Sequence, residues 1–500
     1  MKLNHKAIQN QQWWETRNIL LPEYDLPEMR ERTMRKPTWV HFGAGNLFRI
    51  YIAKIAQTLL NENQTDCGII AVDTSQDGAL KDQVYLKNDL LTLGVTLYAD
   101  GEVRREVIGS VAEIIHKSEY ERLKAIFCSD SLQMVSLTIT EKGYTPEGIP
   151  GLLAKLLKER FQAGGAPVAL VSMDNCSQNG EKLKKAVLAG ADGEFLTYLQ
   201  TKVRFPWTMI DKITPRPDAR VAESLTELGL EDMGILPREK GAAIAPFVNA
   251  ESAEYLVVED DFPNGRPPLE RAHVLLTNRE TVNLTERMKV TACLNPLHTA
   301  MAVLGCMLGY TRIYEEMRDK DIVHLIRTIG EEGLRFVKDP KVLNPRTFLN
   351  ELIENRLPNP YIPDAPQRIA CDTSQKVPIR YGATISAWHE AGEEGNLNGV
   401  AIAVAGWIRY LLGLDDQLKP FEPSPDPRLH ELQNTLKDVQ IGKPVSMEML
   451  KPILSDAAIF PFDLSVSPLG EKIVLLVNEM CAGAGAVRNT IQNHIKEASV

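Results

Sequence analysis

The segment PTWVHFGAGNLFRIYIAKIAQTLL, residues 37–60, restricts the possible fold more than any other part of the chain. Residues 38–42 have the composition of a short buried strand, and residues 47–60 have the periodicity of a helix. A glycine turn, Gly43-Ala44-Gly45, separates them. A strand, a glycine turn and a helix in this order open a dinucleotide-binding unit, because glycines let the backbone approach a pyrophosphate and the helix N-terminus favours its negative charge.

This pattern predicts that the turn and the first helical residues contact a dinucleotide: Gly43, Ala44, Gly45, Asn46 and Leu47. The third glycine of the G-x-G-x-x-G fingerprint is replaced by Phe48. Because many tight turns contain G-x-G, a turn without a ligand remains the alternative.

A second buried strand, GIIAVD, ends in Asp73, 28 residues after Gly45. An acidic side chain at this point accepts hydrogen bonds from the adenosine ribose and repels a 2′-phosphate, which favours NAD over NADP. The alternative is that Asp73 only caps the following turn, since aspartate is a common turn residue.

Further strands and helices alternate along the N-terminal half. The pattern predicts a hairpin over 91–107, a helix over 118–127, a strand over 133–139, a helix over 150–163 and a strand over 168–172. Such alternation indicates an α/β fold with a mostly parallel sheet. Ligands of these sheets bind beyond the carboxyl ends of the strands, so Thr140 and Glu141 are expected near the cofactor. Asn175 also follows a strand, where it is either a turn residue or a donor to an oxyanion.

Three segments are predicted from these patterns: a polar N-terminal arm over 1–37, a Rossmann-type doubly wound domain over 38–284, and a mostly α-helical domain over 285–500. Helical patterns cover 311–337, 346–356, 381–394, 397–413 and 469–496, whereas 204–218 is expected to be a proline-rich connecting segment.

The stretch ERMKVTACLNPLHTAMAVLGCMLGY, residues 286–310, places Lys289, Asn295 and His298 in apolar surroundings. Burial disfavours a charged lysine and lowers its pKa, which makes it a usable acid or base. An asparagine amide can donate to a developing oxyanion, and a neutral histidine can hold a hydroxyl. The structural alternative is a helix cap at Asn295, a core histidine and a surface lysine.

Helix geometry adds a constraint to this stretch. Lys289 and His298 are nine residues apart, about 180° around a regular α-helix. Pro296 also disfavours the α conformation at Asn295. We therefore expect a kink or bulge around Asn295 and a new helix over 296–309.

Composition and charge exclude several classes of protein. The formal net charge of −10 argues against nucleic-acid partners and against an anionic membrane surface. Seven cysteines without a CxxC motif predict free thiols in a reducing cytosol. The N-terminus lacks the apolar run of a signal peptide, and no stretch approaches the roughly 20 apolar residues of a membrane span. A cytoplasmic protein is expected, and its oligomeric state stays open.

A basic cluster follows in the C-terminal half. Arg368, Lys376 and Arg380 lie in and just after RIACDTSQKVP, residues 368–378. Such a cluster can hold a carboxylate or several hydroxyls. A solvated basic rim paired with nearby acids is the alternative.

Seven motifs in order resemble those of the mannitol dehydrogenase family of polyol-specific long-chain dehydrogenases, which includes hexuronate reductases. The resemblance covers about residues 38–490 and rests on HFGAGNLFR, SLTITEKGY, SMDNCSQNG, FPWTMIDKITP, VVEDDFPNGRPPLE, ERMKVTACLNPLH and RIACDTSQK. Two departures are visible: the family's usual Lys-x4-Asn is Lys-x5-Asn here, and Leu47-Phe48-Arg49 replaces Phe-His-Arg.

The resemblance implies a role for each matching residue. Lys289 matches the catalytic acid/base, Asn295 and Asn175 match the oxyanion hole, and His298 matches a residue that bonds the substrate. The remaining matches are substrate-binding Arg368 and Lys376, Asp211 near the substrate, and Glu286 on a proton path.

The implied reaction is metal-independent, NAD(H)-dependent hydride transfer to an open-chain sugar derivative. The first expectation is conversion of D-fructuronate to D-mannonate. Tagaturonate reductase and mannitol 2-dehydrogenase are alternatives, and a non-catalytic NAD-binding sensor is an alternative of another class.

Overall fold

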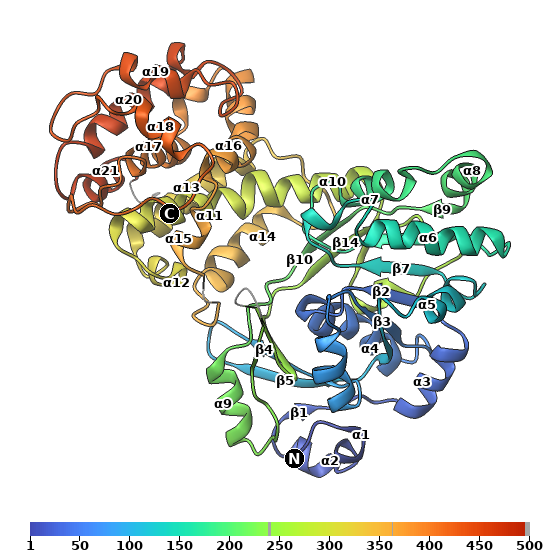
Figure 1. The fold of residues 1–500 in the computed structure, drawn as a ribbon. Coiled ribbons are helices and arrows are strands. Elements are labelled where there is room, and N and C mark those ends of the chain that lie inside the picture. The colour runs from blue at the N-terminus through green and yellow to red at the C-terminus, as the bar shows by residue number, and fades with distance from the viewer. Residues whose placement is uncertain (239–241, 363, 496–500) are drawn as a thin grey trace. The chain divides into compact units, whose positions relative to one another are not determined.

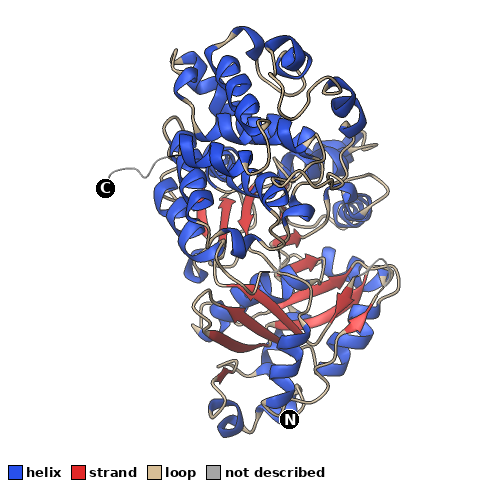
Figure 2. Ribbon diagram, turned by 90° about the vertical axis from the view of Figure 1, so that its left-hand side faces the viewer, coloured by secondary structure: helices blue, strands red, loops and turns tan. Residues whose placement is uncertain are grey.

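The computed structural model describes residues 1–238, 242–362 and 364–495 (Figure 1). The chain forms two compact units, Met1–Asn283 and Leu284–Val500. Strands lie in the first unit, and the described residues of the second form helices and connecting loops (Figure 2). The predicted α/β fold followed by helices is confirmed.

The first unit is built on a six-stranded parallel sheet with the order β6-β3-β2-β7-β8-β9. In chain order this is 3-2-1-4-5-6, the doubly wound arrangement of dinucleotide-binding domains. The strands are β2 (Trp39–Phe42), β3 (Ile69–Asp73), β6 (Val111–His116), β7 (Met134–Leu137), β8 (Val168–Ser172) and β9 (Val203–Arg204).

Helices cover both faces of this sheet, so its central strands are buried throughout. Val40 and Phe42 of β2 pack in one core with residues of α5, α6, α7 and α8, while Trp39 packs in the other core with residues of α4. Successive side chains of one strand thus supply opposite cores. These helices are α4 (Ala53–Asn61), α5 (Tyr120–Phe127), α6 (Ile149–Gln162), α7 (Asn179–Leu188) and α8 (Gly193–Lys202).

A second sheet has the order β1-β5-β4-β13. The predicted hairpin is confirmed: β4 (Thr92–Leu97) and β5 (Val103–Ile108) pair antiparallel. β13 (Phe247–Glu251) and β1 (Ile19–Leu20) join it in parallel on either side.

Smaller sheets complete the first unit. β10 (Thr208–Asp211), β14 (Tyr255–Glu259) and β15 (Leu275–Thr277) form one of them, and β11 (Leu236–Pro237) pairs with β12 (Ala243–Ile244). The expectation of a plain connecting segment over 204–218 is therefore wrong, because β10 lies within it and pairs with β14. The helix α9 (Ala219–Glu227) follows.

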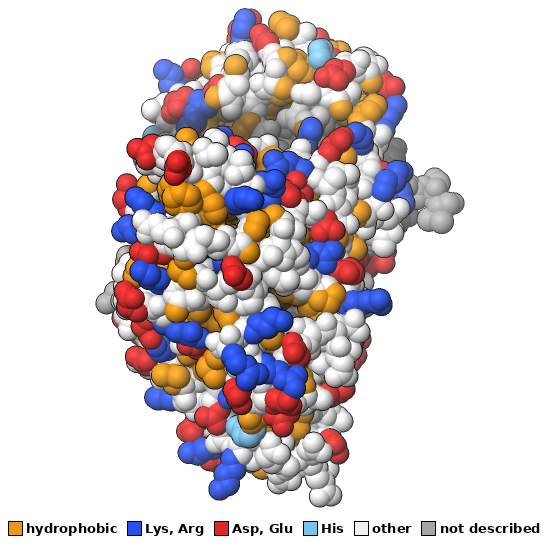
Figure 3. All heavy atoms as spheres, turned by 90° about the vertical axis from the view of Figure 1, so that its right-hand side faces the viewer, with side chains coloured by type: hydrophobic (Ala, Val, Ile, Leu, Met, Phe, Trp, Pro, Cys, Tyr) orange, Lys and Arg blue, Asp and Glu red, His pale blue; other side chains and the backbone are white. Residues whose placement is uncertain are grey.

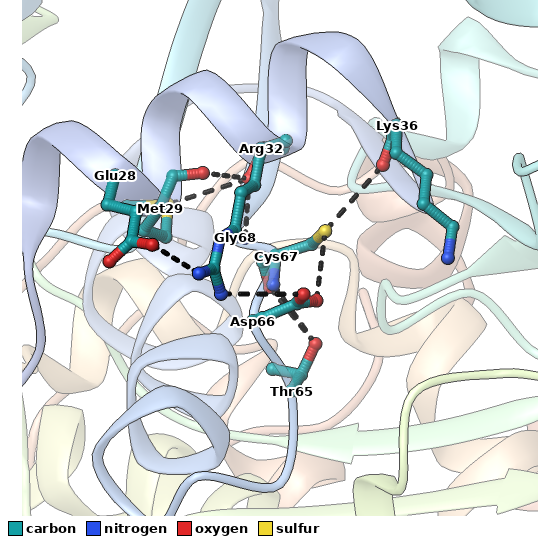
Figure 4. Close-up of polar contacts among 9 residues, drawn as sticks. Glu28, Met29, Arg32, Lys36, Thr65, Asp66, Cys67 and Gly68 are labelled. Atoms are coloured by element: carbon teal, nitrogen blue, oxygen red, sulfur yellow. Dashed lines mark hydrogen bonds and ion pairs between the residues drawn. The ribbon is translucent and has the colours of Figure 1, made fainter.

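The first 37 residues contain α1 (His5–Ile8), α2 (Gln11–Glu15), β1 and α3 (Leu26–Arg35). Side chains of α3 lie over the segment that leads into β3 (Figure 4). The Gly68 N–H donates to Thr33 Oγ1 at 2.7 Å, and the Cys67 thiol lies 3.7 Å from the Lys36 carbonyl. A Cβ on Gly68 would come within 2.5 Å of Met29 Sδ, so this packing depends on the glycine.

The second unit packs around two apolar helices, α11 (Asn295–Leu308) and α17 (Gly399–Tyr410). Every residue of α17 is buried. Its N-terminus is capped by Glu332, whose carboxylate accepts N–H bonds from Asn398, Gly399 and Val400 at 2.6, 2.9 and 2.9 Å. The other helices are α12 (Ile313–Glu316), α13 (Lys320–Leu334), α14 (Pro345–Glu351), α15 (Pro366–Ile369), α16 (Thr373–Glu390), α18 (Leu429–Thr435), α19 (Met447–Leu454), α20 (Pro468–Met480) and α21 (Ala486–His494).

The helical run Arg279–Leu308 joins α10 (Arg279–Met288) to α11 and corrects one expectation. It is long enough and apolar enough to cross a membrane, with a mean hydropathy of 1.3 over its most apolar window. The expectation that no stretch approaches a membrane span is therefore wrong for this helix. Since 72% of that window is buried inside the structure, its apolar side chains are accounted for by core packing.

Candidate active site

A pocket of about 480 Å³ lies at the carboxyl ends of β2, β3, β7 and β8 in the first unit. This is where doubly wound sheets bind nucleotides. The predicted residues that line it are Gly43, Ala44, Gly45, Asn46, Leu47, Asp73, Thr140 and Asn175. Sequence reasoning missed Thr74, Ser75, Leu80, Thr138, Ile139 and Asp174. All of these except Leu80 lie within two residues of a predicted residue that ends or follows a strand, and this is the signal that could have found them.

The two glycines of the turn have different physical tasks. Gly43 has φ +109°, and a Cβ there would lie 2.4 Å from the Thr138 carbonyl oxygen. It therefore allows the turn after β2 to pass against the segment after β7. A Cβ at Gly45 would meet no atom within 4 Å, although Gly45 lines the pocket. That open space beside the backbone fits the close approach of a pyrophosphate.

Asp73 is both a pocket residue and a turn cap. Its Oδ1 accepts the Ser75 N–H at 2.9 Å and its Oδ2 accepts the Lys81 N–H at 3.0 Å. The side chain is only 2% exposed. Each carboxylate oxygen has a second lone pair, so these bonds orient the group without using all of its acceptor capacity.

The loop after β8 is fixed through Asp174, the residue before Asn175. Asp174 Oδ2 accepts from the Tyr144 hydroxyl at 2.5 Å and from Ser172 Oγ at 3.0 Å, and Oδ1 accepts the Cys176 N–H at 3.1 Å. Burial raises the pKa of the Asp174 carboxyl.

Two predicted residues of the first unit lie outside the pocket lining. Glu141 is exposed and forms an ion pair with Lys182. Asp211 ends β10 opposite Tyr255 and is 3% exposed. Its neighbour Lys212 donates to the Glu251 carbonyl at 2.6 Å and pairs with Glu254 at 3.1 Å.

In the second unit, Lys289 begins a π-helical turn, Lys289–Cys293, within the run from α10 to α11. The Leu294 N–H donates to the Lys289 carbonyl at 3.0 Å, an i to i+5 bond. Such a turn holds one residue more than an α-helical turn, and it lies where the sequence has one residue more than Lys-x4-Asn. The predicted bulge is present, but it precedes Asn295 instead of centring on it. Lys289 is 8% exposed, and Glu286 lies on α10 three residues earlier.

Burial is the main reason why His298 is neutral. Burial lowers its pKa to about 4, and the cations Arg380, Arg356 and Arg368 act in the same direction, while Asp364 opposes them. At neutral pH the imidazole is therefore uncharged, so one of its nitrogens can donate a hydrogen bond and the other can accept one.

The three predicted cations adopt different arrangements. Arg368 is exposed and pairs with Asp364. Lys376 donates to the Ile369 carbonyl at 2.7 Å, and burial, with Arg380 nearby, lowers its pKa. Arg380 donates to Thr299 Oγ1 and lies 3.4 Å from the Asn295 carbonyl. The structure thus gathers Asn295, His298, Lys376 and both arginines in one region of the second unit.

Within residues 1–238, 242–362 and 364–495, no group of three or more His, Cys, Asp and Glu side chains is placed to hold a metal ion. All seven cysteines are free thiols. On the face drawn in Figure 3, cationic and anionic side chains are interspersed.

Comparison with known proteins agrees with the two-unit organisation. Residues 37–271 match the mannitol dehydrogenase Rossmann domain, and residues 282–480 match the mannitol dehydrogenase C-terminal domain. The chain is 45% identical to the D-mannonate oxidoreductase of Thermotoga maritima, over 98% of each chain.

Two solved structures have a similar fold. Pseudomonas fluorescens mannitol 2-dehydrogenase, in a ternary complex with NAD and D-mannitol, is 25% identical with a TM-score of 0.73 over 100% of both chains. A D-sorbitol dehydrogenase is 24% identical with a TM-score of 0.80, covering 94% of this chain and 97% of the other. With both family domains matched in order across its length, the chain belongs to the mannitol dehydrogenase family of oxidoreductases.

Proposed function

We propose that the protein interconverts D-fructuronate and D-mannonate with NAD(H) as the cofactor. The observation that carries this proposal is the 45% identity to a D-mannonate oxidoreductase over 98% of both chains. A mannonate differs from a polyol such as mannitol by its carboxylate, so the proposal requires cations in the substrate region.

The second unit supplies such cations. In addition to burial, Arg368 and Arg380 lower the pKa of His298 and that of Lys376, so these cations are close enough to interact electrostatically. Guanidinium and ammonium groups bind carboxylates by charge-assisted hydrogen bonds. Arg368 is the most accessible of the three, with its side chain 68% exposed. We assign carboxylate and hydroxyl binding to Arg368 and Lys376, and hydroxyl binding to neutral His298 and to Asp211.

The chemical roles follow from the residue types. Bound NADH supplies the hydride that reduces the keto carbon. As the keto oxygen gains negative charge, the side-chain amides of Asn175 and Asn295 donate hydrogen bonds to it. The Lys289 ammonium gives this oxygen its proton, and in the oxidation of mannonate neutral Lys289 takes the proton back. Glu286, on the helix that leads into the π-helical turn, passes protons between Lys289 and solvent.

NAD is favoured over NADP by Asp73. Two backbone N–H bonds hold its carboxylate in the pocket wall, so a 2′-phosphate there would face a fixed negative charge. Thr140 contributes to the same wall. We also assign a cofactor contact to the next residue, Glu141. The free thiols are in keeping with a cytoplasmic location.

The experiment measures NADH consumption with D-fructuronate, D-tagaturonate and D-fructose at equal concentrations, with NADPH in parallel. We expect the highest kcat/KM for D-fructuronate with NADH. Preference for tagaturonate would transfer the assignment to that hexuronate. Activity on fructose alone would indicate a mannitol 2-dehydrogenase, the activity named for one structural neighbour. NADH binding without turnover of any of them would indicate a non-catalytic sensor and overturn the proposal.

A further inference from the structure

The π-helical turn that begins at Lys289 is followed by a proline, so the helix lacks one backbone N–H donor at this point. Pro296 lies in the first turn of α11 and has no N–H. The change from i to i+5 bonding back to i to i+4 bonding also alters which carbonyls are paired. Because buried carbonyls need partners, the carbonyl of the π-helical turn that an N–H at position 296 would have served, at Thr291 or Ala292, requires a donor from elsewhere.

α16 provides a donor to Thr291 and further hydrogen bonds to the first two residues of α11. Thr384 Oγ1 lies 3.3 Å from the Thr291 carbonyl, Tyr381 donates its hydroxyl to the Pro296 carbonyl at 2.8 Å, and an Arg380 nitrogen lies 3.4 Å from the Asn295 carbonyl. We refer to Arg380, Tyr381 and Thr384 as the α16 donor set. Thr384 lies four residues after Arg380 and three after Tyr381, so it is a neighbour of both on the helix surface.

Tyr381 is the most constrained member of the set. It is 1% exposed, and burial raises the pKa of its hydroxyl, so the group stays protonated and remains a donor at all physiological pH values. Its hydroxyl donates to the Pro296 carbonyl and also interacts with the Ala300 N–H, so replacing it would remove the bond to Pro296.

A second helix confines the same turn from another side. A Cβ on Gly333 of α13 would lie 2.9 Å from the Ala292 Cα. The π-helical turn therefore packs directly on the backbone of α13. A cavity of about 190 Å³, lined by Thr291, Gly333 and Thr384 among others, adjoins this contact. It gives the turn room to rearrange if the bonds from α16 are lost.

From this geometry we propose that Arg380, Tyr381 and Thr384 are positioning residues that fix the register of the π-helical turn and so the direction of the Lys289 side chain. The inference rests on the proposed function, in which Lys289 transfers the proton. If the extra residue of the turn moved by one position along the helix, Lys289 would rotate by about 100° around the helix axis. Such a rotation would remove the ammonium from the substrate oxygen while leaving the dinucleotide pocket of the first unit unchanged.

The test compares Tyr381→Phe, Thr384→Val and Thr384→Ser in the full-length protein with D-fructuronate and NADH. We expect Tyr381→Phe and Thr384→Val to lower kcat by about 10- to 100-fold, since displacements of about 1 Å have effects of this size. The Kd for NADH should not change. Thr384→Ser keeps the hydroxyl and should restore most of kcat.

Two matched controls remove equivalent buried groups elsewhere in the second unit. Tyr410→Phe removes a hydroxyl that accepts the Ser424 N–H at 2.6 Å, and Thr490→Val removes a hydroxyl that donates to the Ala486 carbonyl at 2.8 Å. Equal losses of kcat in the controls and in the α16 variants would mean a general effect on stability and would overturn the inference. Unchanged kcat in both Tyr381→Phe and Thr384→Val would also overturn it.

A further measurement does not depend on turnover. Amide hydrogen exchange of a peptide spanning 287–298 should become faster in Tyr381→Phe than in the unaltered protein, whereas a peptide spanning 399–410 should not change. Equal exchange at 287–298 would count against the inference even if kcat fell.

Different results would contradict the positioning role of the α16 donor set and the proposed role of Lys289. The double variant Lys289→Ala/Tyr381→Phe should turn over as slowly as Lys289→Ala alone, because the donor set acts through Lys289. If Lys289→Ala itself retained full turnover, the proposed role of the lysine would be wrong. If Lys289→Ala were inactive while Tyr381→Phe was fully active, only the positioning role would be lost.

Discussion

The Tyr144 hydroxyl donates to the Asp174 carboxylate at 2.5 Å, one residue before Asn175. Asp174 also accepts from Ser172 and from the Cys176 backbone. The loop after β8 therefore has a fixed carboxylate on one side of the asparagine to which we assign oxyanion binding. Tyr144, which completes this network, lies in the segment after β7. Segments that follow two different strands therefore position the Asn175 amide.

Tyr144→Phe should lower kcat with a smaller effect on the Kd for NADH. Removing the hydroxyl leaves Asp174 with fewer donors, which costs about 1–3 kcal/mol for a buried charged acceptor and loosens the loop. Steady-state kinetics with D-fructuronate and fluorescence titration of NADH separate the two effects. A fall in NADH affinity without a fall in kcat would contradict a role in placing Asn175.

Lys289→Ala should lose about 10²- to 10⁴-fold in kcat, the usual contribution of a general acid or base, and should still bind NADH. Lys443→Ala, which alters an exposed lysine of the same unit, is the control. Rates of NADH oxidation and an NADH titration test both statements. Full turnover by Lys289→Ala would remove the lysine from the mechanism.

Gly43→Ala and Gly45→Ala should fail in different ways. At Gly43 the new methyl group would lie 2.4 Å from the Thr138 carbonyl oxygen at a positive φ, so the melting temperature should fall. At Gly45 the methyl group meets no protein atom within 4 Å, so stability should hold while NADH affinity falls. Calorimetry and NADH titration of both variants provide the comparison, and equal NADH affinity in Gly45→Ala would exclude the turn from pyrophosphate binding.

Asp73→Asn should weaken NADH binding and raise the relative use of NADPH. The neutral amide no longer repels a 2′-phosphate, but it offers a single acceptor oxygen to the Ser75 and Lys81 N–H groups. The ratio of kcat/KM for NADPH to that for NADH measures the change. An unaltered ratio would leave Asp73 only its role as a turn cap.

His298 should give the protein a defined acid sensitivity. Its pKa is about 4 in the folded chain and near 6.5 in a free histidine, so between these values the unfolded chain binds a proton that the folded chain does not. The contribution of this group to the free energy of unfolding is complete above pH 6.5 and falls as the pH decreases towards 4. Denaturant unfolding of the unaltered protein and of His298→Gln across pH 4–8 isolates it. An equal pH dependence in both proteins would contradict the assignment.

The sequence predicted the elements with strong local signals. The strand over 168–172 matches β8 residue for residue, and the glycine turn lies in the pocket as expected. Predictions from single residues were less accurate where tertiary contacts compensate for a residue that is unfavourable in the local structure. The helix expected from residue 381 begins at Thr373, with Pro378 inside it. Proline normally interrupts a helix. Here Asp426 accepts bonds from the Ser374 N–H and hydroxyl and holds the first turn in place.

Two other features had no local signal. The extra residue between Lys289 and Asn295 was visible, but its accommodation as a π-helical turn depends on donors from α16, more than 80 residues later. The pairing of β13 with β4 also joins distant segments, and alternation within each strand does not identify its partner.

That pairing has a consequence for the synthesis of the chain. β4 ends at Leu97 and its parallel neighbour begins at Phe247, so about 150 residues must be translated before the sheet can be completed. At about 5–20 residues per second, one side of β4 stays unpaired for roughly 8–30 seconds on every ribosome. An open strand edge of this kind is a site for wrong pairing between neighbouring nascent chains. The yield of soluble protein should therefore depend on elongation rate and on chaperones that bind the emerging N-terminal unit.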